Sequence, residues 1–259
     1  MLLSQKSAVI YGAGGALGGA VARAFAREGA RLFLASRTLA KLRAVADEIA
    51  AARGTAEAAQ VDAHDEQAVE RHLDAVARTA GGIDILFNAI GMEDVQGTAL
   101  VDMRVEDFLR PIMVAAKTQF HTARAAARHM AQRGSGVIMT ITAGPPEPIP
   151  YIGGFGPACG VIEGLCRGLA AELGPRGVRV ICLRSAGSPD TPDVRMTFEL
   201  HAKATGVTYE ECLAAFSSTT LLKRLPLAAE VANVAAMMAS DGASAMTGAF
   251  VHVTCGSRE

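Results

Sequence analysis

A cluster of glycines near the amino terminus could bring backbone N–H groups against a phosphate. The stretch VIYGAGGALGGAVARAF (9–25) places these glycines directly after an apolar run and at the start of a helical pattern. Glycine lets the backbone approach a pyrophosphate closely, and the helix dipole favours an anion at a helix amino terminus. The residues that we expect to bind a dinucleotide here are Gly12, Gly14, Gly15, Ala16, Leu17 and Gly18. A glycine-rich turn that joins a strand to a helix for steric reasons alone is the alternative.

The end of the next apolar run bears on which dinucleotide binds. It reads LASRT, with Ser36 and Arg37 and without an acidic residue. An acid there would accept the ribose 2′-hydroxyl of NAD, whereas an arginine can form two hydrogen bonds with a 2′-phosphate. We therefore expect NADP(H) to be favoured over NAD(H). An exposed loop arginine without a ligand is the alternative.

The elements that must position these residues alternate along the chain. Apolar runs typical of strands occupy residues 7–11, 31–35, 58–61, 83–88, 136–142, 177–183 and 249–253. Helical patterns occupy residues 16–28, 39–52, 65–80, 105–132, 155–174 and 228–239. This alternation predicts an α/β fold: a single Rossmann-type, doubly wound domain over 1–259, with a mainly parallel seven-stranded sheet and helices on both faces.

The composition limits the class of protein. The 259 residues include 25 basic and 26 acidic side chains, and the net charge of −1 argues against binding nucleic acid or an anionic membrane through bulk charge. The five cysteines show no CxxC spacing, so we expect reduced thiols and no metal site. No window approaches the roughly 18 consecutive apolar residues of a membrane span, and the first apolar stretch is too short for a signal peptide. We therefore expect a cytoplasmic protein without a membrane partner.

Several motifs resemble the short-chain dehydrogenase/reductase family along the whole chain. The glycine loop is similar to the family's TGxxxGxG, with Tyr11 in place of the threonine and Ala16 in place of the middle glycine. The stretch DILFNAIG (84–91) resembles the family's DILVNNAG, and residues 221–253 closely resemble its carboxyl-terminal segment. Asp62 resembles the family's acid that contacts adenine.

The resemblance implies further cofactor contacts and a mobile lid. Beyond the residues already named, it implies contacts from Asp62, Ala63, Asn88, Ala89, Gly91 and Thr191. Thr191 is the nearest match to the family's threonine that contacts the nicotinamide carboxamide. The resemblance also implies that residues 186–224 form a lid over a small-molecule substrate.

The resemblance further implies where the catalytic residues should lie, and there the chain departs from the family. Family members use a tyrosine to transfer the proton, a lysine four residues later, a serine and an asparagine. Alignment brings these four positions, in that order, to Phe155, Cys159, Ala143 and Ala115. No lysine occurs between Lys117 and Lys203. We therefore expect the usual proton transfer to be lost, which is worth roughly 10²–10⁴-fold in rate.

Three other groups are candidates for the missing chemistry. Thr142 ends the fifth predicted strand, where ligands bind in doubly wound sheets. Tyr151 lies four residues before Phe155 and is loosely similar to the tyrosine of the family's enoyl reductase branch. We predict catalytic roles for Thr142 and Tyr151, against the alternatives of an ordinary strand residue and a packed ring. Cys159 shares a helical stripe with Ile162 and other apolar residues, which favours a buried, inert thiol.

Two classes of function remain open from the sequence. The first is an NADP(H)-binding oxidoreductase with a modified active site, which reduces an activated or conjugated carbonyl compound. The second is a non-redox protein on the same scaffold: a cyclase, an isomerase, a lyase or a nucleotide-binding pseudoenzyme. Small and apolar residues over 105–132 and 155–174 also predict a homo-oligomer, a tetramer or dimer paired through these two helices.

Overall fold

A seven-stranded sheet forms the centre of the molecule. The structure is a computed structural model that describes residues 1–143 and 149–257. The strands are β1 (Ser7–Tyr11), β2 (Arg31–Ser36), β3 (Thr55–Gln60), β4 (Ile85–Asn88), β5 (Gly136–Ala143), β6 (Val178–Ser185) and β7 (Ala249–Val253). Their order is β3-β2-β1-β4-β5-β6-β7, and every neighbouring pair is parallel. The predicted α/β fold with a doubly wound sheet is confirmed.

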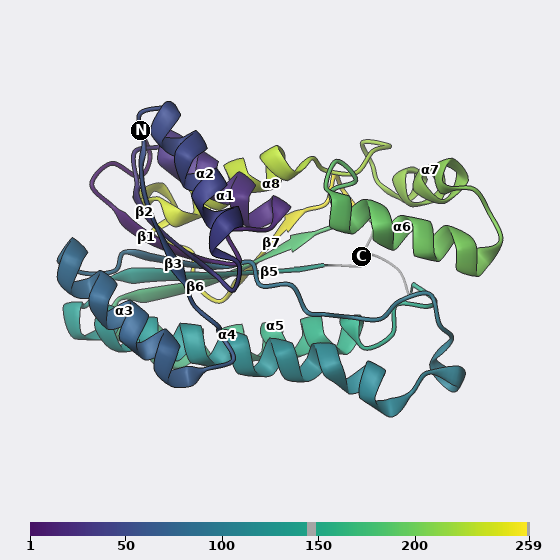
Figure 1. Cartoon of the computed structure of the whole chain (residues 1–259), viewed down its shortest axis with the longest axis horizontal. Helices are drawn as coiled ribbons and strands as arrows, with labels where there is room; N and C mark the ends of the chain where they lie inside the picture. The colour runs from purple at the N-terminus through teal and green to yellow at the C-terminus, as the bar shows by residue number, and fades with distance from the viewer. Residues whose placement is uncertain (144–148, 258–259) are drawn as a thin grey trace.

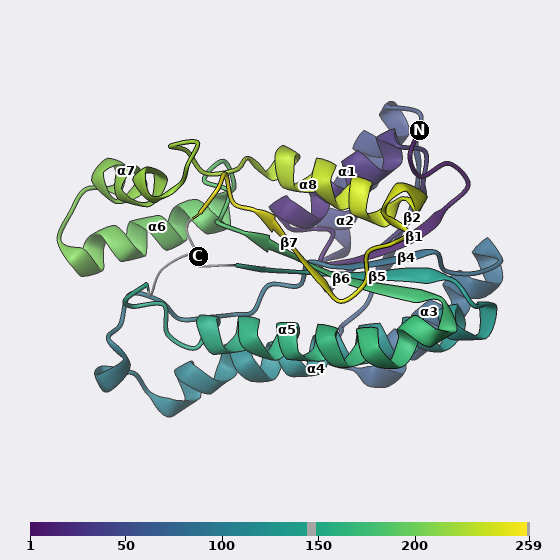
Figure 2. The same cartoon turned by 180° about the vertical axis from the view of Figure 1, so that it is seen from behind.

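Helices cover both faces of this sheet (Figures 1 and 2). One face carries α1 (Ala16–Arg27), α2 (Leu39–Ala51) and α8 (Ala228–Ala239), and the other carries α3 (Glu66–Ala80), α4 (Val105–Arg133) and α5 (Phe155–Leu173). Two further helices, α6 (Pro192–Thr205) and α7 (Tyr209–Thr219), lie beyond the carboxyl ends of the strands. Short 3₁₀ helices occupy Leu100–Asp102, Gly174–Arg176 and Asp241–Ala243.

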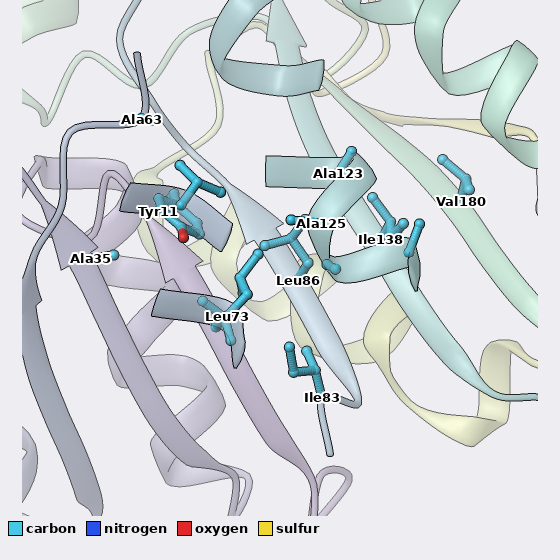
Figure 3. Packing of buried hydrophobic residues seen from close by; sticks show 14 of the residues in the cluster. Tyr11, Ala35, Ala63, Leu73, Ile83, Leu86, Ala123, Ala125, Ile138 and Val180 are labelled. Atoms are coloured by element: carbon cyan, nitrogen blue, oxygen red, sulfur yellow. The ribbon is translucent and has the colours of Figure 1, made fainter. Parts of the chain in front are cut away.

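Apolar side chains fill the space on each side of the sheet. All five residues of β1 are buried, as expected of a parallel strand covered on both faces. Figure 3 shows one cluster, in which Tyr11 and Leu86 from the sheet meet Leu73 of α3 and Ala123 of α4. A second cluster joins the opposite face of the sheet to α1, α2 and α8.

The predicted boundaries agree with the structure except in two places. The third strand was predicted at 58–61 but lies at Thr55–Gln60, where small residues and an exposed sheet edge weaken the apolar signal. The segment after β6, which the sequence predicts to be irregular and partly helical over about 186–222, holds two regular helices, α6 and α7. The sequence does carry a start signal for α7, because Thr208 and Glu211 form a reciprocal capping box.

The strand order fixes where a ligand can bind. The chain winds outward in one direction from β1 to β3 and in the other from β4 to β7, so the order reverses between β1 and β4. In doubly wound sheets a crevice opens at the carboxyl ends of the strands at this point. In the part of the chain that the structure describes, no helix is long and apolar enough to span a bilayer.

Candidate active site

The first cavity lies at the carboxyl ends of β1 and β4 and has a volume of about 490 Å³. We call it the glycine-loop cavity. Of the residues predicted to bind the cofactor, it brings together Gly12, Gly14, Gly15, Ala16, Leu17, Gly18, Ser36, Arg37, Asp62, Ala63, Ala89 and Gly91. These predicted residues therefore line one cavity.

The glycines of the loop are needed for both packing and access. Gly12 has a φ of +77°, and a Cβ atom there would collide with the carbonyl group of Ala89. A Cβ at Gly18 would collide in the same way with the Gly12 carbonyl. No side chain caps the amino terminus of α1 behind Gly15. The N–H groups of its first turn are therefore free to bind an anion.

One end of this cavity gathers hydroxyl and cationic groups. Ser36, Arg37, Thr38 and Lys41 all line it. No side chain caps the amino terminus of α2 beside Thr38, so the positive end of that helix dipole adds to the cationic character. Lys41 was not predicted from the sequence, although its position four residues after Arg37, near the start of a predicted helix, could have indicated it.

The Arg37 guanidinium already has a partner. Its Nη2 lies 2.7 Å from Oε1 of Glu93, which follows β4 and lines the same cavity. Both side chains are exposed, so the ion pair is screened by solvent and weak. A 2′-phosphate bound there must therefore share or displace the Glu93 contact, a competition that no local sequence pattern could predict.

Asn88 supports the site although it lines neither the glycine-loop cavity nor a second cavity that lies under α6 and α7. Its Nδ2 donates to Oγ1 of Thr122 at 2.7 Å, and its Oδ1 accepts a hydrogen bond from the backbone of Ile90 at 3.1 Å. Both of these bonds fix the chain just after β4, where Ile90 lines both cavities. Thr191 lies in the second cavity, and its hydroxyl donates to the Ser188 carbonyl at 2.7 Å.

The second cavity, of about 330 Å³, lies under α6 and α7 and is called the lid cavity. It adjoins the glycine-loop cavity, because the two share Leu17, Ala89, Ile90, Gly91 and Asp193 as lining residues. Its apolar lining includes Met92, Ile149, Ile152, Phe155, Val194, Phe198, Phe216 and Leu225. A ligand can therefore extend from the glycine loop into a pocket that suits an apolar molecule.

Thr142 lines the lid cavity from the end of β5. Its hydroxyl donates to Oε1 of Glu163 at 3.2 Å, since a carboxylate can only accept. Glu163 is held in turn by Arg184 through two hydrogen bonds of 2.8 and 2.7 Å. Burial acts to raise the pKa of Glu163, but hydrogen bonds from Arg184 and Thr142 outweigh it and leave that pKa below its ordinary value. The Thr142 oxygen therefore offers lone pairs rather than a proton to the cavity.

Tyr151 does not join Thr142 among the residues that line the lid cavity. It adopts a φ of +64°, and its carbonyl accepts a hydrogen bond from Gly97 at 2.8 Å. It thus ties the segment before α5 to the loop after β4. The structure gives its ring no contact with the other candidate groups.

A chain of three polar side chains at the lid cavity was missed in the sequence. Gln96 donates from Nε2 to Oδ2 of Asp94 at 2.6 Å, and its Oε1 lies 2.6 Å from Nε2 of His201. All three residues line the cavity. His201 is 5% exposed, and burial lowers its pKa below the ordinary value. The Gln96–His201 contact joins residues 105 positions apart, so no local sequence motif could predict it.

Comparison with known proteins decides the family. A family model described as Enoyl-(Acyl carrier protein) reductase matches residues 12–258. The chain belongs to the short-chain dehydrogenase/reductase family. Among its family relatives, "Uncharacterized oxidoreductase YxbG" of Bacillus subtilis (strain 168) is 31% identical over 246 residues, which cover 95% of this chain and 88% of that protein.

Two solved structures of dehydrogenase/reductase proteins share the fold. An NAD+-bound xylitol dehydrogenase has a TM-score of 0.93 at 24% identity, and the match covers 99% of this chain and 100% of that one. An actinorhodin polyketide ketoreductase with NADPH has a TM-score of 0.88 at 23% identity, and the match covers 97% of each chain. Structural neighbours of this family member thus bind nicotinamide dinucleotides, in one case NAD+ and in the other NADPH.

The four positions that the resemblance implies for the family's catalytic residues belong to one region of the structure. Phe155 and Ala143 line the lid cavity, while Ala115 and Cys159 are buried in the apolar cluster against which the first two pack. Burial raises the pKa of the Cys159 thiol to about 12, so it stays protonated at neutral pH and is a poor nucleophile. None of these four side chains can exchange a proton with a substrate near neutral pH.

Proposed function

We propose that the protein binds NADP(H) in the glycine-loop cavity and reduces an activated or conjugated carbonyl compound in the lid cavity. The observation that carries this proposal is that the two cavities adjoin and share five lining residues. One ligand can place phosphates at the amino terminus of α1 and still extend beneath α6. When bound there, NADPH supplies a hydride.

The residues present fit a phosphorylated dinucleotide. A Cβ atom at Gly14 would come within 3.2 Å of the Ser36 hydroxyl, so a side chain at this position would crowd the place where a ribose is expected. The uncapped first turn of α1 can bind the pyrophosphate. Ser36, Arg37 and Lys41 offer donors for a 2′-phosphate. This set supports NADP(H) over NAD(H), although Glu93 opposes it.

The lid cavity favours a substrate that needs little acid catalysis. The tyrosine and lysine positions hold Phe155 and Cys159, and the Thr142 proton is directed towards Glu163. A simple ketone would leave its developing alkoxide without the family's donor, whereas a conjugated carbonyl spreads the charge over an enolate. The apolar lining selects a largely apolar molecule around the reacting group.

NADPH binding and turnover test the proposal separately. We expect quenching or enhancement of NADPH fluorescence on binding, and NADPH oxidation at 340 nm with cyclohex-2-enone or 9,10-phenanthrenequinone. Cyclohexanone, the matched saturated ketone, should react far more slowly. Equal rates for cyclohexanone and cyclohexenone would refute the argument from the missing tyrosine and lysine.

A non-redox reaction on the same scaffold is the second candidate. The chain of Asp94, Gln96 and His201 favours it, because proton transfer alone could isomerise a substrate without a hydride. Binding of NADPH without oxidation of any probe would favour this candidate. Absence of NADPH binding would remove the first proposal altogether.

A further inference from the structure

The lid helix α6 carries a basic group that the family's pattern does not supply. We propose that His201 is the catalytic residue that exchanges a proton with the substrate oxygen, and that Gln96 and Asp94 position it. The inference rests on the proposed function, because this proton transfer accompanies hydride transfer in the lid cavity. His201 lines that cavity together with Thr142 and Phe155.

The hydrogen bonds fix which nitrogen of His201 carries the proton. The Asp94 carboxylate can only accept, so the amide nitrogen of Gln96 faces it and the amide oxygen faces His201. That oxygen accepts from Nε2–H of the imidazole at 2.6 Å. The neutral ring therefore carries its proton on Nε2 and leaves a lone pair on Nδ1. Among the described residues, no partner approaches Nδ1.

Packing holds the ring in this orientation. The ring of Phe216 on α7 meets the His201 ring edge-on, with centroids 6.2 Å apart and planes at 85°. The loop that carries Gln96 is itself fixed, because the backbone of Gly97 donates to the Tyr151 carbonyl at 2.8 Å. His201 is thus hydrogen-bonded through Nε2 and in contact with the Phe216 ring, and among the described residues Nδ1 has no hydrogen-bond partner. This arrangement is typical of a base held by a third group.

The proton balance of the step is complete. In reduction, the electrophilic carbon of the substrate accepts the hydride, and the carbonyl π pair moves onto the carbonyl oxygen. In a conjugated carbonyl attacked at the β-carbon, the C=C π pair shifts at the same time to form the double bond of the enolate. That oxygen takes the proton from Nδ1–H of the His201 imidazolium and leaves a neutral imidazole. With a conjugated carbonyl the first product is an enol, which becomes the ketone by proton exchange with water. In alcohol oxidation the same steps run in reverse.

Charge around the ring sets the direction of the pH dependence. In the described part of the chain, two other titratable groups line the lid cavity with His201: Asp94, which contacts the ring through Gln96, and Asp193 on the same helix. The remaining titratable groups of α6 and α7 are Arg195, Glu199, Lys203, Tyr209, Glu210, Glu211 and Cys212, and burial raises the pKa of Cys212. Burial keeps the His201 pKa below its ordinary value, so the imidazole is neutral at neutral pH. Reduction needs the protonated ring and should slow as the pH rises through that pKa. Oxidation of an alcohol needs the neutral ring, so its rate should rise as the pH rises through the same pKa.

The first test uses His201→Gln, whose amide N–H can still donate to Gln96 but cannot carry a catalytic proton. With NADPH and 9,10-phenanthrenequinone between pH 5 and 8, we expect kcat to fall about 100-fold and the pH limb to disappear. The NADPH dissociation constant should stay within about twofold. The matched control is His129→Gln on α4, where the histidine pairs only with Asp74 near the surface. A His201→Gln protein with the kcat and pH profile of the natural protein overturns the inference and leaves the proposed function standing.

The second test does not depend on turnover. Two-bond ¹H–¹⁵N correlation spectra of histidine-labelled protein at pH 7.5 should show His201 as the Nε2–H tautomer. The Gln96→Met variant, similar in size but unable to accept from the ring, should lose this fixed tautomer. A His201 ring protonated on Nδ1 in the natural protein would overturn the inference whatever the activity. Failure of the natural protein to oxidise NADPH with any probe would instead overturn the proposed function.

Discussion

Arg37 and Glu93 determine together how strongly the protein discriminates between the two dinucleotides. A charge-assisted contact to a 2′-phosphate contributes about 1.5–3 kcal/mol. Arg37→Ala should therefore weaken NADPH binding roughly ten- to a hundredfold and leave NADH binding nearly unchanged. Fluorescence titration with both cofactors measures this. Equal affinity of the natural protein for NADPH and NADH would remove the basis of the assignment.

Glu93→Gln is the matched variant for that experiment. It removes the carboxylate that lies 2.7 Å from Arg37 and leaves the volume unchanged. NADPH should then bind more tightly, because its 2′-phosphate no longer competes with the Glu93 carboxylate for the Arg37 guanidinium. Unchanged NADPH affinity would show that the Arg37–Glu93 pair is too well screened to matter.

The residues that were predicted from the sequence depend on local features of the chain, whereas those that were missed depend on contacts between distant segments. Gly12 and Gly18 were predictable because their constraint is a local one, a backbone that tolerates no Cβ. Arg37 was predictable from its place at the end of a strand. Gln96 and His201 were not, because their roles exist only where a loop after β4 meets a helix far along the chain.

His72 should make the fold sensitive to acid. Its Nδ1 is hydrogen-bonded to the Tyr11 hydroxyl at 2.8 Å beneath the glycine loop, and burial lowers its pKa to about 4. Between pH 6.5 and about 4 the unfolded chain binds this proton and the folded chain does not. The free energy of unfolding should therefore drop by about 3 kcal/mol across that window and be restored above it.

Urea unfolding of the natural protein and His72→Gln at pH 7 and about pH 4.5 isolates this contribution. Glutamine can still accept from Tyr11 but does not titrate, so the variant should lose less stability in acid. The comparison between the two proteins cancels the other histidines and carboxylates. Parallel loss of stability in both proteins would contradict the assignment.

At the scale of elements, the reliability of prediction followed the burial of each element. β1, β4 and α8 pack deep in the molecule, and their apolar patterns marked their positions closely. β3 lies at the sheet edge with the pattern TAEAAQ, in which small residues give little contrast between faces. α6 and α7 bury few residues, so their helical period was too weak to read.

Helix α5 offers a direct test of the altered mechanism. The double change Phe155→Tyr with Cys159→Lys would place a hydroxyl in the lid cavity and a cation one helical turn away, which depresses a tyrosine pKa. A lysine at 159 would find negative charge nearby, because Asp94 and Glu163 both act to raise the pKa of Cys159. We expect cyclohexanone reduction with NADPH to be faster than in the natural protein, and a further gain with Ala143→Ser.

Phe155→Tyr alone is the control for that experiment, because without a cation the hydroxyl keeps a pKa of about 10. This single variant should gain little cyclohexanone reductase activity. A brisk cyclohexanone reductase in the natural sequence would show that the alignment of this helix is wrong, provided that His201→Gln leaves the rate unchanged. Loss of that rate in His201→Gln would instead show that the acid has moved to the lid.

At the scale of the whole molecule, one outer face is unusually apolar. α4 and α5 lie side by side on the same face of the sheet (Figures 1 and 2). Leu109, Met113 and Phe120 of α4 are each at least 44% exposed and share one side of that helix. On α5 the glycines at 160, 164 and 168 recur every four residues, and a Cβ atom at any of them would meet open space. Exposed apolar side chains on one helix and a row of exposed glycines on its neighbour are typical of an interaction surface.

We expect this face to pair with the same face of a second copy across a two-fold axis, as the small residues of the two helices predict from the sequence. The glycine row lets a partner helix approach closely, and the α4 side chains would then be buried at its flanks. Gly164→Gln with Phe120→Glu should therefore lower the mass measured by light scattering at micromolar concentration, while circular dichroism stays unchanged. Ala44→Glu, on the exposed side of α2, adds a charge elsewhere and should leave the assembly intact. A natural protein that is monomeric in this measurement, or a double variant with undiminished mass, would show that another surface, or none, joins the copies.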